Sequence, residues 1–276
     1  MNEAYGRFKG IGMGQAVLWR YPLEEALNIV EENGFDLIEL WAEHPDVYNS
    51  LEDKNEASRL KEILSSHGLK VTVHAPCHDV NIASINDGIR KESVRQITSS
   101  VKLASYIDAS VVTVHPGRRS SKHVATEIFV RNSVASLKEI SLSAEELDVI
   151  IGVENMENRP NQFVIEPKDV TRLVTEVGSD HVGITFDAAH ANTLFDPVRF
   201  MREIRELIVH IHLSNNFGKE GPVHLPLDTG NIDIAALLRE LNDSGYSEFI
   251  ALEGGGEFGK EAVRRNSLFL RKLGVL

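Results

Sequence analysis

Residues 182–190 read VGITFDAAH, a run that alternates in the manner of a β-strand, ends in Asp187 and is followed closely by His190. Seven further β-rich runs have the same form, and longer segments with helical spacing separate them. Alternation of strand and helix along a chain indicates an α/β protein with a parallel sheet. The predicted strands are 11–17, 35–42, 70–76, 110–117, 149–156, 182–190, 208–214 and 248–255.

The segments between these strands predict amphipathic helices. In residues 23–34, LEEALNIVEENG, the apolar side chains share one face and Gly34 supplies a C-terminal stop; residues 57–68, ASRLKEILSSHG, have the same form. Eight strand–helix repeats predict a (β/α)8 TIM barrel, with residues 1–276 as a single domain. A doubly wound open sheet is the alternative, and it is disfavoured because no glycine-rich dinucleotide-binding motif follows the first strand.

Composition limits the classes of function. The chain has 276 residues, of which 42% are hydrophobic and 25% charged, as in ordinary globular proteins. Its formal charge of -12 disfavours long-range attraction to DNA phosphates. The sequence shows neither a signal-peptide layout nor an apolar run of the roughly 18 residues that a membrane span needs. Cys77 is the only cysteine, so no internal disulfide can form, and we expect a cytoplasmic protein in a reducing compartment.

Histidines and acids gather where the predicted strands end. In a TIM barrel these C-terminal ends carry the active site. Buried charges have to be paired or to bind a metal, and strand alternation points the three acids into the barrel. We therefore predict a divalent metal site, and we expect His210, one layer deeper than the strand end, to be structural. The residues at or just beyond the strand ends are His74, His115, Glu154, Asp187, His190, His212, Glu253 and His224.

The chain resembles the xylose isomerase-like barrels from about residue 10 to residue 255. That superfamily includes sugar phosphate isomerases and epimerases and the endonuclease IV class of DNA repair nucleases. The motifs are specific in combination, whereas HPG or GVEN alone would be weak. The resemblance rests on VHAPCHDVNIAS (73–84), VVTVHPG (111–117), GVENM (152–156), GITFDAAHAN (183–192), HIHLSNN (210–216), HLPLDTGNID (224–233) and ALEGGG (251–256).

The resemblance implies a metal-dependent sugar or sugar phosphate isomerase or epimerase. In such enzymes a cation binds adjacent carbonyl and hydroxyl oxygens of an open-chain sugar and stabilises the ene-diolate that forms when a carbon-bound proton leaves. By resemblance, Glu154 and Glu253 would also exchange that proton as the catalytic acid and base. The matching metal ligands are Glu154, Asp187, His212 and Glu253.

The resemblance is also compatible with an endonuclease IV-like zinc phosphodiesterase that acts on abasic DNA. In that class His74 and His115 would complete a second metal site bridged by Glu154, and His190 and His224 would belong to a third. A dehydratase of the same superfamily is compatible with the same motifs, and so is a non-catalytic barrel that binds metal or sugar.

One departure disfavours the nuclease. Pro222 stands where the nucleases have a ligating aspartate, and proline has no side-chain oxygen; Glu220 and Asp228 are candidates to substitute. The loop at 41–53 is acidic, and Cys77 occupies a place where an inserting aromatic residue would serve a nuclease that flips bases. We therefore expect His190 to contact substrate together with His224.

The sequence offers candidate groups for binding the substrate and the metal. Arg118, in HPGRRSSKH (115–123), and Lys219 are candidates to bind a phosphate or carboxylate of the substrate. The four-ligand set suits manganese, magnesium or cobalt, whereas adding His74 and His115 favours zinc, with one or two ions bound. The expected partner is a small sugar or sugar phosphate; nucleic acid and membrane are not expected, and association into a homo-oligomer stays open.

Overall fold

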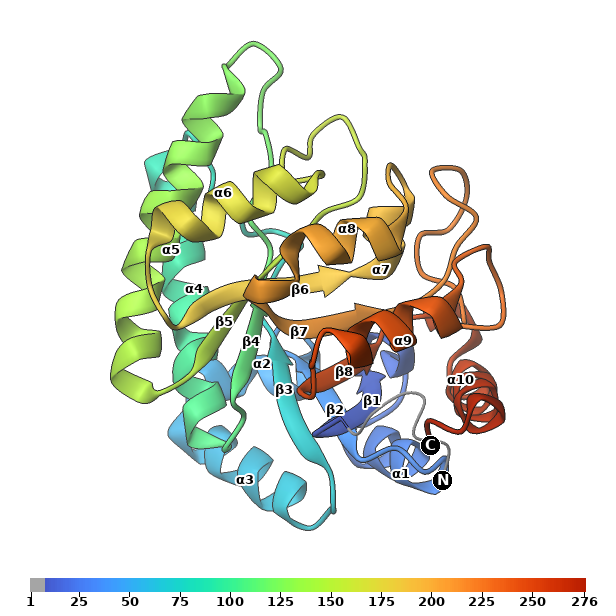
Figure 1. Ribbon diagram of the computed structural model, residues 1–276. Coiled ribbons are helices and arrows are strands. Elements are labelled where there is room, and N and C mark those ends of the chain that lie inside the picture. The colour runs from blue at the N-terminus through green and yellow to red at the C-terminus, as the bar shows by residue number, and fades with distance from the viewer. Residues whose placement is uncertain (1–7) are drawn as a thin grey trace.

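The computed structural model describes residues 8–276 and contains a closed barrel of eight parallel strands (Figure 1). Each strand pairs with its neighbour in the sequence, and β8 pairs with β1 to close the ring. All eight predicted strands and the TIM barrel are confirmed, and the closure excludes the open sheet. The strands are β1 Gly10–Gly14, β2 Leu37–Trp41, β3 Lys70–His74, β4 Val111–Val114, β5 Ile150–Glu154, β6 Val182–Asp187, β7 Ile208–Leu213 and β8 Phe249–Leu252.

Helices surround the barrel and cover the outer faces of the strands (Figure 1). The predicted helices after the first two strands are present as α1 and α3, and Gly34 ends the first of these segments with a left-handed φ of 85°. The main core lies between strands and helices. The helices are α1 Leu23–Glu32, α2 Pro45–Tyr48, α3 Lys54–Ser65, α4 Asp87–Tyr106, α5 Thr126–Leu147, α6 Pro167–Val177, α7 Ala188–Asn192, α8 Pro197–Ile204, α9 Ile234–Asp243 and α10 Lys260–Leu273.

The interior of the barrel changes in character along the strands. At the N-terminal end, Leu37, Val111 and Phe249 form a small apolar cluster with Ile150 against it. Two residues further along, the same strands carry Glu39, Thr113, Gly152 and Ala251, and two further still come Trp41, His115, Glu154 and Glu253. Because successive inward residues are two apart, each strand runs from an apolar end to a polar end.

Gly152 is required by this packing. A Cβ atom at this position would overlap the Thr185 hydroxyl of the neighbouring strand. The absence of a side chain lets β5 and β6 pair closely directly beneath Glu154 and Asp187. The glycine therefore sets the spacing of the two carboxylates above it.

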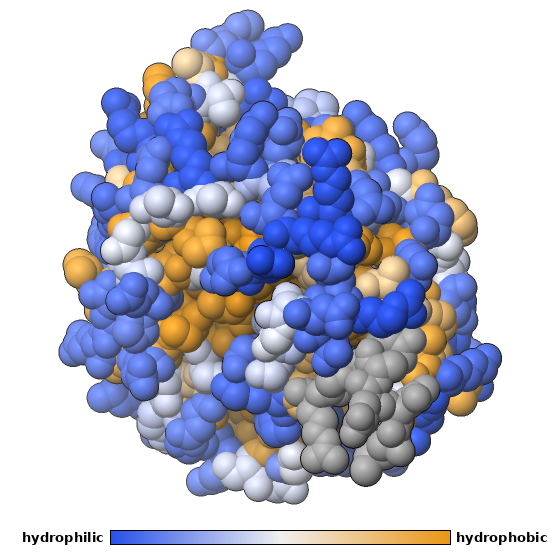
Figure 2. All heavy atoms as spheres, in the orientation of Figure 1, coloured by the Kyte–Doolittle hydropathy of each residue, from blue (hydrophilic) through white to orange (hydrophobic). Residues whose placement is uncertain are grey.

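Hydrophilic side chains cover most of the molecular face seen in Figure 2, and apolar side chains show near the centre of this face and in smaller areas toward its edges. Exposed apolar atoms in this amount are normal for a globular surface. Among residues 8–276, no helix is long and apolar enough to cross a membrane.

Candidate metal centre

Four predicted metal ligands meet at the C-terminal end of the barrel. Ligand atoms of Glu154, Asp187, His212 and Glu253 all lie within 4.8 Å of one another. They come from the ends of β5, β6 and β7 and from the residue after β8. His212 Nδ1 is 3.0 Å from Glu154 Oε1 and 3.3 Å from Glu253 Oε1. The four predicted ligands, which belong to four separate strands in the sequence, are therefore neighbours in space.

Three carboxylate oxygens at this centre have no hydrogen-bond partner among the described residues. They are Glu154 Oε2, Asp187 Oδ2 and Glu253 Oε1, and each is buried. A buried carboxylate oxygen without a donor is costly unless a cation balances it. One imidazole and three carboxylates form a donor set that divalent metals accept. The residues present therefore fit a divalent ion.

His212 is held from behind by Glu39, a residue that was not predicted from the sequence. Its Nε2 lies 2.8 Å from Glu39 Oε1 on β2, and both side chains are fully buried. Glu39 Oε2 also accepts a hydrogen bond from the hydroxyl of Thr72 (2.9 Å) and lies 2.7 Å from His210 Nε2. His210 therefore belongs to the supporting layer, as predicted. The sequence feature that could have indicated Glu39 is an acidic residue at an inward-facing position of a predicted strand.

Asp187 is fixed by its backbone and by the helix that follows. Its N–H donates to Asn155 Oδ1 (2.9 Å), and Asn155 Nδ2 donates to its carbonyl (3.0 Å). Asp187 Oδ1 accepts the N–H of His190 (2.5 Å) and so caps α7. These contacts leave Oδ2 directed at the centre, and Asn155 is a second residue that was not predicted from the sequence.

His74 and His115 lie next to the centre. His115 Nε2 is 2.8 Å and His74 Nε2 is 3.8 Å from Glu154 Oε2. The Nδ1 atom of His74 contacts the carbonyl of Ala75 (2.7 Å), and its ring stacks on Trp41 with centroids 4.4 Å apart. The structure thus brings both histidines to Glu154, as expected of ligands to a second ion.

His190 and His224 are also brought together. Their ring centroids are 5.0 Å apart, and ligand atoms of Asp187, His190 and His224 lie within 4.8 Å of one another. The two suggested substitutes for the aspartate missing at Pro222 lie elsewhere. Asp228 pairs with Arg265 (2.5 Å), and Glu220 is exposed. Asp187 is therefore the carboxylate that groups with both histidines, but it is already part of the main centre.

Burial and neighbouring charges shift the pKa values of the two predicted catalytic acids in opposite directions. Burial raises the pKa of Glu253 to about 7, with the negative charge of Glu154 acting in the same direction and His212 opposing it. Burial also disfavours ionisation of Glu154, but the imidazoles of His212 and His115 hold its pKa well below the usual range. Separated pKa values of this kind are what a pair of carboxyl groups needs in order to act as acid and base.

A cavity of about 580 Å³ opens above the centre, within the range of small-molecule sites. Arg118 lines it, but its guanidinium donates to the carbonyls of Cys77, Val80 and His78 and so supports the loop after β3. Lys219 is exposed and is not among the lining residues. The lining residues include Trp41, His74, Cys77, His115, Arg118, Glu154, Glu157, Arg159, His190, His224 and Glu253.

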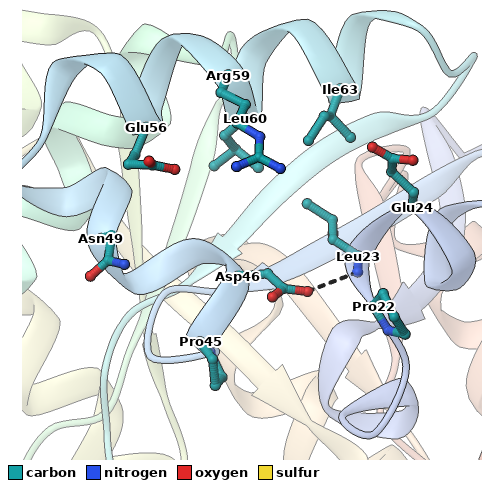
Figure 3. Close-up of a pocket in the computed structure, with 10 residues that line it drawn as sticks. All are labelled: Pro22, Leu23, Glu24, Pro45, Asp46, Asn49, Glu56, Arg59, Leu60 and Ile63. Atoms are coloured by element: carbon teal, nitrogen blue, oxygen red, sulfur yellow. Dashed lines mark hydrogen bonds between the residues drawn. The ribbon is translucent and has the colours of Figure 1, made fainter.

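A second cavity, of about 540 Å³, lies away from the centre beside α1, α2 and α3 (Figure 3). Asp46 in this cavity accepts the N–H of Leu23 (2.9 Å). Among the described residues, none that lines it carries a buried side-chain polar atom without a partner. It therefore lacks the unsatisfied donors or acceptors that mark the metal centre.

Residues 27–273 match the family model for the xylose isomerase-like TIM barrel. The chain belongs to this family. An uncharacterized protein of Methanocaldococcus jannaschii is 32% identical over 247 residues, covering 88% of this chain and 82% of the relative. A probable endonuclease 4 of Mycobacterium tuberculosis is 24% identical over 228 residues, covering 80% and 86%.

A solved structure with a similar fold is named for its likeness to a sugar epimerase. The crystal structure of a D-tagatose 3-epimerase-like protein superimposes with a TM-score of 0.82 and 28% identity, covering 97% of this chain and all of the other. The resemblance noted from the motifs is thereby confirmed. A probable endonuclease and an epimerase-like protein are both similar to this chain, so the choice between these activities depends on the residues of the site.

Proposed function

We propose that the protein is a divalent-metal-dependent sugar isomerase or epimerase that acts on a small keto sugar. The observation that carries the proposal is the group of Glu154, Asp187, His212 and Glu253, with three buried carboxylate oxygens that lack hydrogen-bond partners among residues 8–276. A bound cation would polarise adjacent carbonyl and hydroxyl oxygens of the sugar and offset the charge that develops when a carbon-bound proton leaves. The likeness to the D-tagatose 3-epimerase-like structure supports a keto sugar as substrate.

The protein's own groups would carry the proton. Glu154 and Glu253 both approach His212 Nδ1, so their carboxyl groups flank one space at the cavity floor. One would remove the proton from the carbon next to the carbonyl, and the other would return a proton there or at a neighbouring atom. His190, with Nε2 3.7 Å from Glu157 Oε2, would hold a sugar hydroxyl from the side. Trp41 would exclude water from one wall of the cavity.

Zinc-dependent cleavage of abasic DNA is the second candidate because His74 and His115 both face Glu154 Oε2. The net charge of -12 and the absence of an aspartate at Pro222 weigh against it. Arg118 and Arg159 are two cations of the cavity lining that would meet a phosphorylated substrate. Three backbone carbonyls already take up N–H groups of Arg118, and Arg159 pairs with Glu157 (3.1 Å).

The test is a panel of keto sugars and their phosphates incubated with the protein and manganese or cobalt in deuterated water. We expect deuterium in the sugar and a new isomer on chromatography, and we expect both to be lost in Glu154→Gln and Glu253→Gln. The Glu127→Gln variant, in an exposed pair with Arg172, is the control that keeps activity. Nicking of an abasic plasmid that disappears in His115→Ala, with no exchange into any sugar, would replace the proposal with the nuclease.

A further inference from the structure

Cys77, the only cysteine in the chain, lies beside the metal centre rather than in the hydrophobic core. It follows β3 by three residues and lines the same cavity as the ligands. Its Sγ atom lies within 4.8 Å of ligand nitrogens of both His74 and His115. A thiol and two imidazoles so close together form a donor set that prefers zinc.

A buried atom without a partner points at this group. Glu154 Oε2 accepts no hydrogen bond from the described residues, yet it lies 2.8 Å from His115 Nε2 and 3.8 Å from His74 Nε2. Contact between the Nδ1 atom of His74 and the carbonyl of Ala75 leaves Nε2 of this ring turned toward the cavity. Glu154 Oε2 thus lies close to Nε2 of both rings, and Cys77 Sγ lies within 4.8 Å of ligand nitrogens of the same two rings.

We propose that Cys77 Sγ, His74 Nε2, His115 Nε2 and Glu154 Oε2 bind a second divalent ion of the zinc class, with the Cys77 thiolate as its fourth ligand. Four protein donors complete the tetrahedral shell of zinc and leave no open position, as in structural zinc sites. The second ion would therefore order the loop after β3 rather than activate water. The inference rests on the proposed metal centre because Glu154 is common to both ions.

The proton that leaves Cys77 when the thiolate forms can be taken up by a neighbouring carboxylate. Cys77 Sγ donates to Glu43 Oε1 (3.4 Å), and the same oxygen contacts His78 Nδ1 (2.5 Å), whose side chain is 67% exposed. On metal binding the S–H bond breaks, the sulfur lone pair forms the bond to the ion, and the proton passes to Glu43 and from there to solvent. No oxidation state changes, so no redox partner is needed.

The experiment uses the full chain loaded with cobalt(II). We expect the wild-type protein to show a thiolate-to-cobalt charge-transfer band in the near ultraviolet, which only Cys77 can produce because no other cysteine exists. Cys77→Ser should lose the band and bind the second ion more than about a hundredfold more weakly, beyond the effect of changing a supporting residue alone. In the zinc-loaded protein, X-ray absorption should show sulfur at about 2.3 Å.

Matched variants separate this site from its neighbours. His115→Ala should abolish the band, whereas His78→Ala should keep it, because His78 belongs to the separate group of Glu43, Cys77 and His78. Asp187→Asn should impair the main centre but keep the band. Cobalt bound to the wild type without a thiolate band, or a band that depends on His78 and not on His115, would overturn the proposal. A band without sugar conversion would contradict only the proposed function.

Discussion

Glu39 Oε1 lies 2.8 Å from His212 Nε2, on the side of the imidazole opposite the nitrogen that faces Glu154 and Glu253. Burial disfavours a charge on Glu39, but His212 and His210 hold its pKa well below the usual range, so its carboxyl stays ionised. Carboxylates behind metal-binding histidines orient the ring and raise its basicity. Glu39 is therefore a positioning residue of the centre, because its carboxylate contacts the ring nitrogen of His212 that faces away from Glu154 and Glu253.

Replacing Glu39 by Gln tests this positioning role, since the amide keeps the shape and removes the charge. We expect metal affinity to fall by about 10- to 100-fold, measured by competition with a coloured chelator. Thr72→Val is the matched control because it removes one hydrogen bond to Glu39 and leaves the contact with His212. An unchanged affinity in folded Glu39→Gln would show that the carboxylate does not act on the centre.

Metal removal should lower thermal stability. An ion that binds only the folded chain adds about 2.7 kcal/mol at a hundredfold excess over its Kd, which corresponds to roughly 5 to 10 °C in Tm for a domain of this size. We expect a chelator to remove this increment and Asp187→Asn to abolish most of the response in scanning calorimetry. Glu127→Gln, on the outer surface, should respond to metal like the wild type.

Gly152→Ala should destabilise the barrel by about 1 to 3 kcal/mol, because the added methyl group overlaps the Thr185 hydroxyl. It should also weaken metal binding by separating Glu154 from Asp187. Gly68→Ala is the control, since its Cβ would meet nothing nearer than a carboxylate oxygen at 3.6 Å. Equal unfolding midpoints in denaturant for the two variants would contradict the packing described for β5 and β6.

The raised pKa of Glu253 predicts a pH effect on the metal-free protein. The folded chain keeps this proton up to about pH 7, whereas the unfolded carboxyl loses it near its ordinary value of 4.5. Since the folded state binds more protons in this window, the contribution of Glu253 makes the free energy of unfolding fall as pH rises from 4.5 to 7. Glu253→Gln should flatten that part of the profile in chelator-treated samples, and parallel profiles for the two proteins would refute the assignment.

The architecture was predictable because each strand carries its own signal. The alternating run ending in Asp187 and its seven counterparts fixed the number of strands, and Gly34 marked the end of a helix at a position where φ is positive. The ligands were predictable because barrels place chemistry at strand ends, and Glu154, Asp187, His212 and Glu253 all lie there. These are local features, readable without knowing which strands are neighbours.

The supporting residues were not predictable in the same way. Glu39 reaches His212 across the barrel interior, and Glu39 and His210 are 171 positions apart in the sequence, which gives no signal of contact. Lys219 was expected near substrate from its loop alone, but the loop turns it outward. Arg118 reaches the cavity as expected, although its donors are taken up by loop carbonyls, which depends on the conformation of residues 77–80.

The inner faces of the strands change from apolar to polar along their length, and this separates the residues that stabilise the fold from those available for chemistry. The apolar residues Leu37, Val111 and Phe249 hold the barrel together at the end remote from the ligands. Side chains at the other end can therefore be exchanged during evolution at little expense to folding, provided that the small residues between them, such as Gly152 and Ala251, are kept. A barrel built in this way can pass from one reaction to another by altering single residues at its rim, in keeping with this chain's similarity to both a probable endonuclease and an epimerase-like protein.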